Sequence, residues 1–319
     1  MIGSAAGTTK VAVVGAGSVG ATLAYACLVR GIGRTIALYD VDADKTRAEV
    51  LDLNHGLQFV PPATVIGSDD IEVCRGADLV VITAGAKQKP GQTRLELAEA
   101  NVALSRTLVP RLLAVAPDAI LLLVTNPVDV VTYAALKYSG LSPQRVFGSG
   151  TVLDSSRLRL LVAEHCGVAV QSVHAYIAGE HGDSETPLWS SASIGSVPLL
   201  AWDVPGRPPL DAATRDQIVR RVIGSAGEII RGKGATNYAV GLAAARIIEA
   251  VLDDQRLVLS VSSLLDGQAG IHDVCLSLPS VVNRDGVDAV LPGPLSEEEA
   301  EGLRRSAETV RGVIAGLGL

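Results

Sequence analysis

The sequence has few cysteines, no excess of positive charge and no apolar run long enough to cross a membrane. Four cysteines occur among 319 residues, none of them in a CxxC pair: Cys27, Cys74, Cys166 and Cys275. This scatter is typical of reduced core residues and excludes a disulfide framework. Their spacing to the five histidines is not that of a metal site either, so we expect no metal.

Acidic residues outnumber basic ones, with 34 Asp and Glu against 27 Lys and Arg and a formal net charge of −7. We therefore expect no nucleic acid and no anionic membrane among its partners. The longest apolar stretch, Ala119 to Val128, is shorter than the roughly 20 residues of a membrane-spanning helix. No charged and apolar signal-peptide pattern opens the chain. These features predict a cytoplasmic protein.

The chain is long enough for two domains, each with its own core. Up to about residue 150, apolar strand-like segments alternate with helical ones, a pattern typical of a parallel sheet with helices on both faces. The expected strands here are 11–14, 35–39, 79–83, 119–125 and 146–150, and the last is expected to end the sheet. Beyond it we expect helices at 154–165, 214–231, 236–252 and from 296, and strands at 173–177 and near Leu257 and Ser277.

A glycine motif, Gly15-Ala-Gly-Ser-Val-Gly20, joins the first strand to an Ala-rich helix. Gly15 permits a tight turn, Gly17 lets a pyrophosphate approach the backbone, and Gly20 lets the helix pack closely on the sheet. The phosphates would lie at a helix N-terminus, which favours anions. The motif therefore predicts a dinucleotide site, to which we also assign Val19.

The second strand ends at Asp40, about twenty residues beyond the last glycine, as the dinucleotide fingerprint requires. A carboxylate there accepts hydrogen bonds from a ribose and repels a 2'-phosphate, so the expected cofactor is NAD rather than NADP. The predicted fold class is α/β. A Rossmann-type doubly wound parallel sheet occupies residues 8–149, and an α+β substrate domain follows in residues 150–319.

Two further motifs carry side chains suited to proton transfer and anion binding. Asp154 and Arg157 stand three residues apart at a helix start, and His181 lies in a short loop between glycines. A carboxylate beside an imidazole raises the pKa of the ring, and arginine binds a carboxylate with two parallel hydrogen bonds. With a nicotinamide, these groups suit interconversion of a 2-hydroxy acid and a 2-oxo acid. Alternatively, His181 is satisfied by local backbone, and Arg157 forms only an i,i+3 ion pair worth about 0.2–0.5 kcal/mol.

The ordered motifs along nearly the whole chain resemble those of the lactate/malate dehydrogenase family, in particular its bacterial lactate-specific members. They are GAGSVG, Asp40, TAGAKQKPGQTR, TNPVD, DSSR, GEHGDS and KGATNY. The resemblance implies NAD-dependent reduction of pyruvate to L-lactate, with His181 as proton donor and acceptor and Asp154 as its orienting partner. Malate dehydrogenase activity and an NAD-binding protein without catalysis are the alternatives.

The same resemblance implies roles for the remaining site residues. Arg157 would hold the substrate carboxylate, and Arg94, on a loop that closes over the substrate, would polarise the reacting carbonyl. Asn126 would bind the substrate oxygen and the cofactor side of the pocket, and Thr236 would lie near the substrate methyl group. Gly85 and Ala86 would contact the cofactor.

Gln88 is expected to decide which 2-oxo acid is used. By resemblance, members of the family that act on malate have an arginine there, which pairs with the second carboxylate. A buried carboxylate without its partner costs about 3–5 kcal/mol, so the neutral amide favours pyruvate and lactate. Lys87 and Lys89 bring positive charge to the same loop and keep the malate alternative open.

Arg159 and His174 match the fructose 1,6-bisphosphate site of regulated bacterial members of the family. The resemblance implies that these cations from facing subunits meet near a symmetry axis of a homotetramer, where the bisphosphate relieves their repulsion. Alternatively, the two residues are a solvated arginine and a structural histidine.

Overall fold

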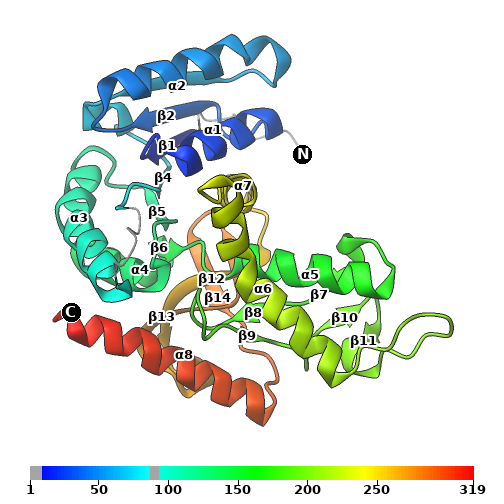
Figure 1. The fold of residues 1–319 in the computed structure, drawn as a ribbon. Coiled ribbons are helices and arrows are strands. Elements are labelled where there is room, and N and C mark those ends of the chain that lie inside the picture. The colour runs from blue at the N-terminus through cyan, green and yellow to red at the C-terminus, as the bar shows by residue number, and fades with distance from the viewer. Residues whose placement is uncertain (1–8, 87–92) are drawn as a thin grey trace, which may run out of the picture.

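The computed structural model describes residues 9–86 and 93–319, which form one large sheet with helices on both sides and a second, mixed region beside it (Figure 1). The sheet order is β3-β2-β1-β4-β5-β6-β12-β13-β14. Its first six strands are parallel and follow the Rossmann order. They are β1 (Lys10–Val14), β2 (Thr35–Tyr39), β3 (Thr64–Ser68), β4 (Leu79–Ile82), β5 (Ile120–Leu123) and β6 (Val146–Gly148).

The central parallel strands are apolar because they are covered on both faces. In β1, Val11 pairs with Ile36 of β2 on one side and with Leu79 of β4 on the other. These strands were predicted from their continuous apolar runs. Strand β3, with the sequence Thr-Val-Ile-Gly-Ser, was missed because it lies at the sheet edge, where most of its side chains contact solvent.

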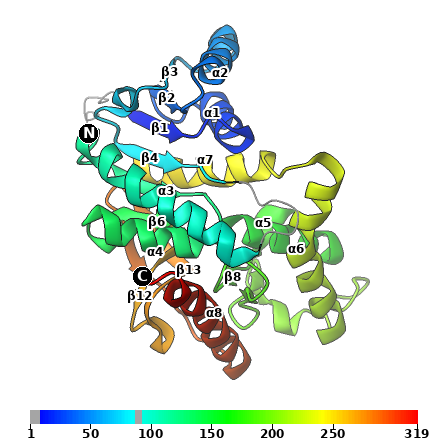
Figure 2. The same cartoon turned by 60° about the vertical axis from the view of Figure 1, so that its left-hand side comes forward.

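Helices cover the two faces of the sheet in the expected doubly wound arrangement. On one face, Leu23 of α1 and Ile248 of α7 share a core with Ile36. On the other face, Leu112 of α3 and Val131 of α4 share a second core with the sheet (Figure 2). The helices around this sheet are α1 (Ser18–Arg30), α2 (Ala43–His55), α3 (Arg94–Val115), α4 (Val128–Ser139) and α7 (Tyr238–Leu252).

The sequence pattern predicted that the strand at 146–150 ends the large sheet, and this prediction is wrong. Strand β12 pairs antiparallel with β6 through Ser262 and Gly148, and β13 and β14 continue the sheet. An unpaired edge at β6 would expose backbone donors and acceptors, which this addition satisfies. The added strands are β12 (Leu257–Asp266), β13 (His272–Asn283) and β14 (Gly286–Val290). A domain boundary near residue 150 stays a prediction, and the sheet crosses it.

The second region contains α5 (Val152–Cys166), α6 (Ala212–Lys233) and α8 (Glu297–Gly316) with short strands. The single strand predicted at 173–177 is wrong. Its residues form β7 (Val173–His174), which pairs with β10 (Ser193–Ile194), and β8 (Ile177–Ala178), which pairs with β9 (Thr186–Pro187). The chain therefore changes sheets between them. The remaining strand is β11 (Val197–Pro198). None of the helices in the described part of the chain is long and apolar enough to cross a membrane.

Candidate active site

The glycine motif forms a tight loop between β1 and α1. Gly15 has a φ of +104°, and its N–H donates to the Tyr39 carbonyl at 2.7 Å. A Cβ on Gly20 would lie 1.8 Å from the Gly15 carbonyl oxygen, so only glycine allows this approach of helix and loop. A Cβ on Gly17 would meet no atom within 4 Å, which leaves open space in front of the N-terminus of α1. This cradle suits the pyrophosphate of NAD.

Asp40 extends the same site from the end of β2. Its carboxylate accepts the Ala16 N–H at 2.7 Å and the Asp42 N–H at 3.2 Å, so it also holds the glycine loop. The side chain is only half-buried, which leaves it accessible to a ribose. Val19 is half-buried on α1, where it packs against the core.

Asn101 of α3 connects the two loops that follow β4 and β5. Its side-chain oxygen accepts the Ala86 N–H at 2.7 Å, and its amide nitrogen donates to the Asn126 carbonyl at 2.7 Å. Asn101 is 1% exposed. It thus fixes Gly85 and Ala86 relative to Asn126, at the carboxyl edge of the sheet where α/β folds bind ligands. Asn101 was not among the residues predicted from the sequence. The signal for it there was a polar side chain among apolar positions of a helix.

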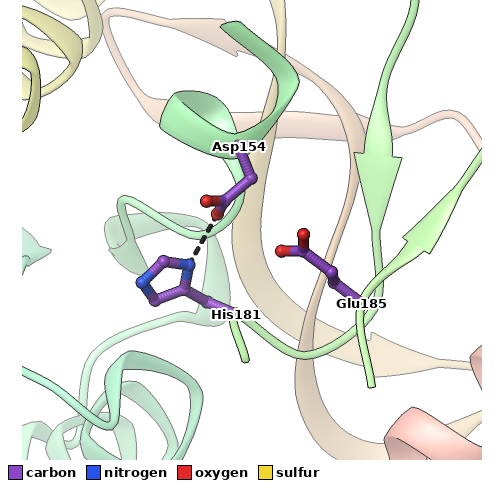
Figure 3. Close-up of side chains that lie close together, drawn as sticks. All are labelled: Asp154, His181 and Glu185. Atoms are coloured by element: carbon purple, nitrogen blue, oxygen red, sulfur yellow. Dashed lines mark hydrogen bonds and ion pairs between the residues drawn. The ribbon is translucent and has the colours of Figure 1, made fainter. Parts of the chain in front are cut away.

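Asp154, Arg157 and His181 form a connected group, as the sequence predicted. Asp154 Oδ2 lies 2.6 Å from His181 Nδ1, and Asp154 Oδ1 accepts from Arg157 Nη1 at 2.6 Å (Figure 3). The side chains of Asp154, Arg157 and His181 are 3%, 15% and 26% exposed. Asp154 lies in the first turn of α5, while the loop after β8 carries His181.

The electrostatics of this group favour a protonated imidazole. Burial lowers the pKa of His181, but the charge and hydrogen bond of Asp154, with a further contribution from Asp129, outweigh it and raise the pKa to about 9. Burial acts to raise the pKa of Asp154, yet His181 and Arg157 hold that pKa below its ordinary value. Asp154 is therefore ionised near neutral pH, and His181 carries a proton that it can donate.

Asp129 of α4 supports His181 from a second side and was not predicted. Its carboxylate accepts the His181 backbone N–H at 2.8 Å and the Ser262 hydroxyl at 2.6 Å. Burial raises the pKa of Asp129 to about 6, although both hydrogen bonds and the charge of His181 oppose this rise. The signal in the sequence was a carboxylate inside the apolar segment Val128-Asp-Val-Val131.

Comparison with known proteins shows which family the chain belongs to. The model of the lactate/malate dehydrogenase NAD binding domain matches residues 9–148, and that of the alpha/beta C-terminal domain matches residues 151–316. The chain belongs to the lactate/malate dehydrogenase family. It is an NAD-dependent 2-hydroxy acid dehydrogenase, and the predicted family, fold class and cofactor are confirmed.

Relatives within the family match the whole chain. The L-lactate dehydrogenase of Bifidobacterium animalis subsp. lactis is 54% identical over 319 residues, with both chains fully covered. That of Thermoanaerobacter pseudethanolicus is 46% identical over 305 residues, which cover 96% of this chain and 98% of that one. Among solved structures, a lactate dehydrogenase from a Medee basin deep-sea metagenome library is 39% identical with a TM-score of 0.94, covering 98% of this chain and 99% of that chain.

The other site residues predicted from the dehydrogenase motifs lie at strand ends and helix starts. Asn126 is exposed at the end of β5, and Thr236 is half-buried just before α7. Arg94 is the first residue of α3, and the Thr93–Glu96 capping box fixes the backbone of that turn. Gln88 lies outside the described residues, so the predicted specificity residue is not placed.

The predicted effector residues lie on α5 and β7 of the second region. Arg159 of α5 donates from Nε to the Ala175 carbonyl at 2.8 Å, and its guanidinium lies 4.8 Å from the centre of the Tyr176 ring. His174 is exposed on β7, next to Ala175. Arg159 is therefore held against the segment that carries His174.

A third acidic group faces the Asp154–His181 pair. Among the described residues, Asp154, His181 and Glu185 are the one set of three whose nitrogen and oxygen atoms lie close enough for a metal ion, all within 4.8 Å of one another. The Arg157 guanidinium already binds Asp154, and His181 carries a proton, and both oppose a cation. We therefore interpret the three residues as an imidazolium between two carboxyl groups rather than as a metal site.

Proposed function

We propose that the chain catalyses the reversible reduction of pyruvate to L-lactate, with His181 as the proton donor and acceptor. The observation that carries this proposal is the Asp154 carboxylate, which lies 2.6 Å from both His181 Nδ1 and Arg157 Nη1. One side chain thus orients both the proton donor and a cation for the substrate carboxylate. The relatives named L-lactate dehydrogenase support lactate as the product.

His181 would give its proton to the substrate oxygen. Nδ1 faces Asp154, and the other ring nitrogen points away from that carboxylate (Figure 3). NAD, when bound in its reduced form, supplies the hydride that reaches C2 of the substrate. Because the Asp154 carboxylate stabilises the imidazolium, His181 is charged before reduction and neutral after it. The reverse reaction needs the neutral ring, so lactate oxidation is favoured as pH rises through about 9.

Arg157 and Arg94 would bind and polarise the substrate. Arg157 uses Nη1 for Asp154, and its remaining N–H groups suit a bidentate contact with the substrate carboxylate. Arg94 starts α3 and would stabilise charge on the reacting oxygen. Asn126 would contact the same oxygen, and Thr236 would line the methyl side.

The proposed acid is tested with His181→Asn. Because the amide cannot deliver a proton, we expect kcat for pyruvate reduction to fall by about 10²–10⁴-fold. NADH affinity should be retained, since the glycine loop and Asp40 are untouched. Steady-state NADH oxidation and fluorescence titration with NADH measure the two quantities. A variant that reduces pyruvate at the normal rate would exclude His181 as the acid.

We propose that Gln88 selects pyruvate over oxaloacetate, because a neutral amide leaves the second carboxylate of oxaloacetate without a cationic partner. Initial rates with each substrate test this, with Gln88→Arg as the comparison. Pyruvate should be preferred by orders of magnitude in the native chain, and the arginine should move activity toward oxaloacetate. Preference for oxaloacetate in the native chain would make malate the product.

We also propose a homotetramer in which Arg159 and His174 bind fructose 1,6-bisphosphate. The support is the position of Arg159, which is held beside the His174 segment by the Ala175 carbonyl and the Tyr176 ring. The bisphosphate should lower the KM for pyruvate, and Arg159→Ala should remove that effect. Sedimentation velocity with and without the bisphosphate measures the assembly state. A location in the cytoplasm stays a prediction.

A further inference from the structure

Glu185 is a buried carboxyl group that the chemistry described above does not use. It lies just before β9 and is 8% exposed. Its Oε1 atom is buried and has no hydrogen-bond partner among the described residues. Burying an unpaired polar atom is costly, and the cost is smaller for a neutral carboxylic acid than for a carboxylate.

The carboxyl group of Glu185 points toward the Asp154–His181 pair (Figure 3). One atom from each of the three side chains lies within 4.8 Å of the other two. Burial and the negative charges of Asp154 and Glu180 raise the pKa of Glu185 to about 8, while His181 and Arg157 oppose the rise. Asp129, on α4, accepts the backbone N–H of His181, and its charge acts on the same imidazole.

Two carboxylates this close cannot both ionise without a large electrostatic cost. Asp154 is kept ionised by its bonds to Arg157 and His181, so the proton belongs on Glu185. We propose that Glu185 is a positioning residue, a neutral acid that faces the Asp154–His181 pair during turnover, and that its ionisation opposes binding of the anionic substrate. This proposal rests on the proposed function, in which Arg157 binds the substrate carboxylate.

The proposal makes substrate binding depend on two protons. His181 must be protonated to donate to the substrate oxygen, and Glu185 must be protonated so that no extra negative charge faces Arg157. Above the ionisation range of both groups, affinity for the anion should fall about 100-fold per pH unit, compared with about 10-fold for a single proton.

The test is the affinity of oxamate, a pyruvate analogue that cannot accept hydride, for the enzyme–NADH complex between pH 7 and 10. NADH binding is measured over the same range, and each series is run with and without a chelator. In Glu185→Gln the amide reproduces the neutral acid, so affinity at pH 7 should fall less than about fivefold. The limiting slope of oxamate affinity against pH should change from that of two protons to that of one.

Glu299→Gln is the matched control, because Glu299 is a buried carboxylate of the same region, 5% exposed. It accepts the Ser190 N–H at 2.8 Å and the Ser296 N–H at 2.8 Å, and not groups of the Asp154–His181 pair. This variant should keep the two-proton slope. Glu185→Ala removes the carboxyl group and leaves a cavity, and it should also show the one-proton slope. This variant therefore distinguishes the loss of the ionisable group from a change in packing.

A two-proton slope in Glu185→Gln, or a one-proton slope in the native enzyme, would overturn the role of Glu185. A loss of oxamate affinity of more than about 50-fold at pH 7 in Glu185→Gln would show that the residue acts as an anion, and would also overturn the proposal. A two-proton slope of the native enzyme that appears only without chelator would assign the effect to a bound metal instead. The proposed function fails separately, through the absence of pyruvate reduction by the native enzyme.

Discussion

At the scale of single residues, the site contains three carboxyl groups that differ in pKa. Asp154 has two cationic partners and a lowered pKa, whereas burial raises the pKa of Asp129 to about 6 and that of Glu185 to about 8. The difference follows from the neighbours, because each group is buried and only Asp154 bonds directly to both Arg157 and His181. His181 therefore lies among carboxyl groups that differ in how readily they lose a proton.

Replacing Asp129 with Asn should change how stability depends on pH. The folded-state pKa of Asp129, about 6, lies above its unfolded value, so the folded state binds this proton more tightly. Binding of this proton stabilises the folded state fully below about pH 4, and the stabilisation is lost as pH rises through about 6. Asp129→Asn should remove that loss.

Urea denaturation of Asp129→Asn and the native enzyme between pH 4 and 7 measures this effect. The variant should also be less stable at pH 4 by about 1–3 kcal/mol, because its NH₂ group faces a donor. Equal pH slopes for the two proteins would contradict the assigned pKa of Asp129.

At the scale of elements, helix starts and strand ends place the site residues. The first turn of α5 carries Asp154, and α3 begins at Arg94 inside a capping box between Thr93 and Glu96. Asn101, two turns further along α3, connects the ends of β4 and β5. The position of α3 therefore couples the cofactor loops to the residue proposed to polarise the substrate.

Thr93→Ala should weaken the start of α3. Loss of the capping box costs about 1 kcal/mol of stability, and we expect kcat for pyruvate to fall because Arg94 follows directly. Ser296→Ala removes the equivalent box of α8 and is the matched control.

Thermal unfolding and steady-state kinetics of both capping variants distinguish the two effects. Both should lose similar stability, and only Thr93→Ala should lose activity. Normal kcat in Thr93→Ala would show that the cap does not govern Arg94.

At the scale of the whole molecule, the two halves of the chain share one sheet and the core on one of its faces. Strands β12–β14 extend the parallel sheet from β6, and α7 packs beside α1 (Figure 1). Ile248 of α7 is fully buried against residues of the first half. We therefore expect the chain to unfold as one cooperative unit.

Ile248→Ala should destabilise both halves together, by about 2–5 kcal/mol, because it leaves a cavity in the shared core. Calorimetry should show one transition at a lower temperature. Ile66→Ala, at a side chain that is 36% exposed on β3, should cost less than about 1 kcal/mol. Two separate transitions would show that the halves unfold independently.

The sequence by itself determined the features that depend on local chemistry. Apolar strands alternating with helices predicted the parallel sheet, and Gly15, Gly17 and Gly20 predicted the dinucleotide loop, because periodicity and turn geometry are encoded in neighbouring residues. His181, Asp154 and Arg157 were found in the same way, from their motifs. Their roles were taken from the family.

Only the tertiary structure decided which distant groups meet. Asn101 and Glu185 lie outside the dehydrogenase motifs, and Asp129 ends the TNPVD motif, which does not show what its carboxylate contacts. The fold places the three residues against His181 or the strand ends. The attachment of β12 to β6 is likewise a long-range pairing with no local signal. Burial then sets the proton affinities, because desolvation depends on everything packed around a group rather than on its neighbours in sequence.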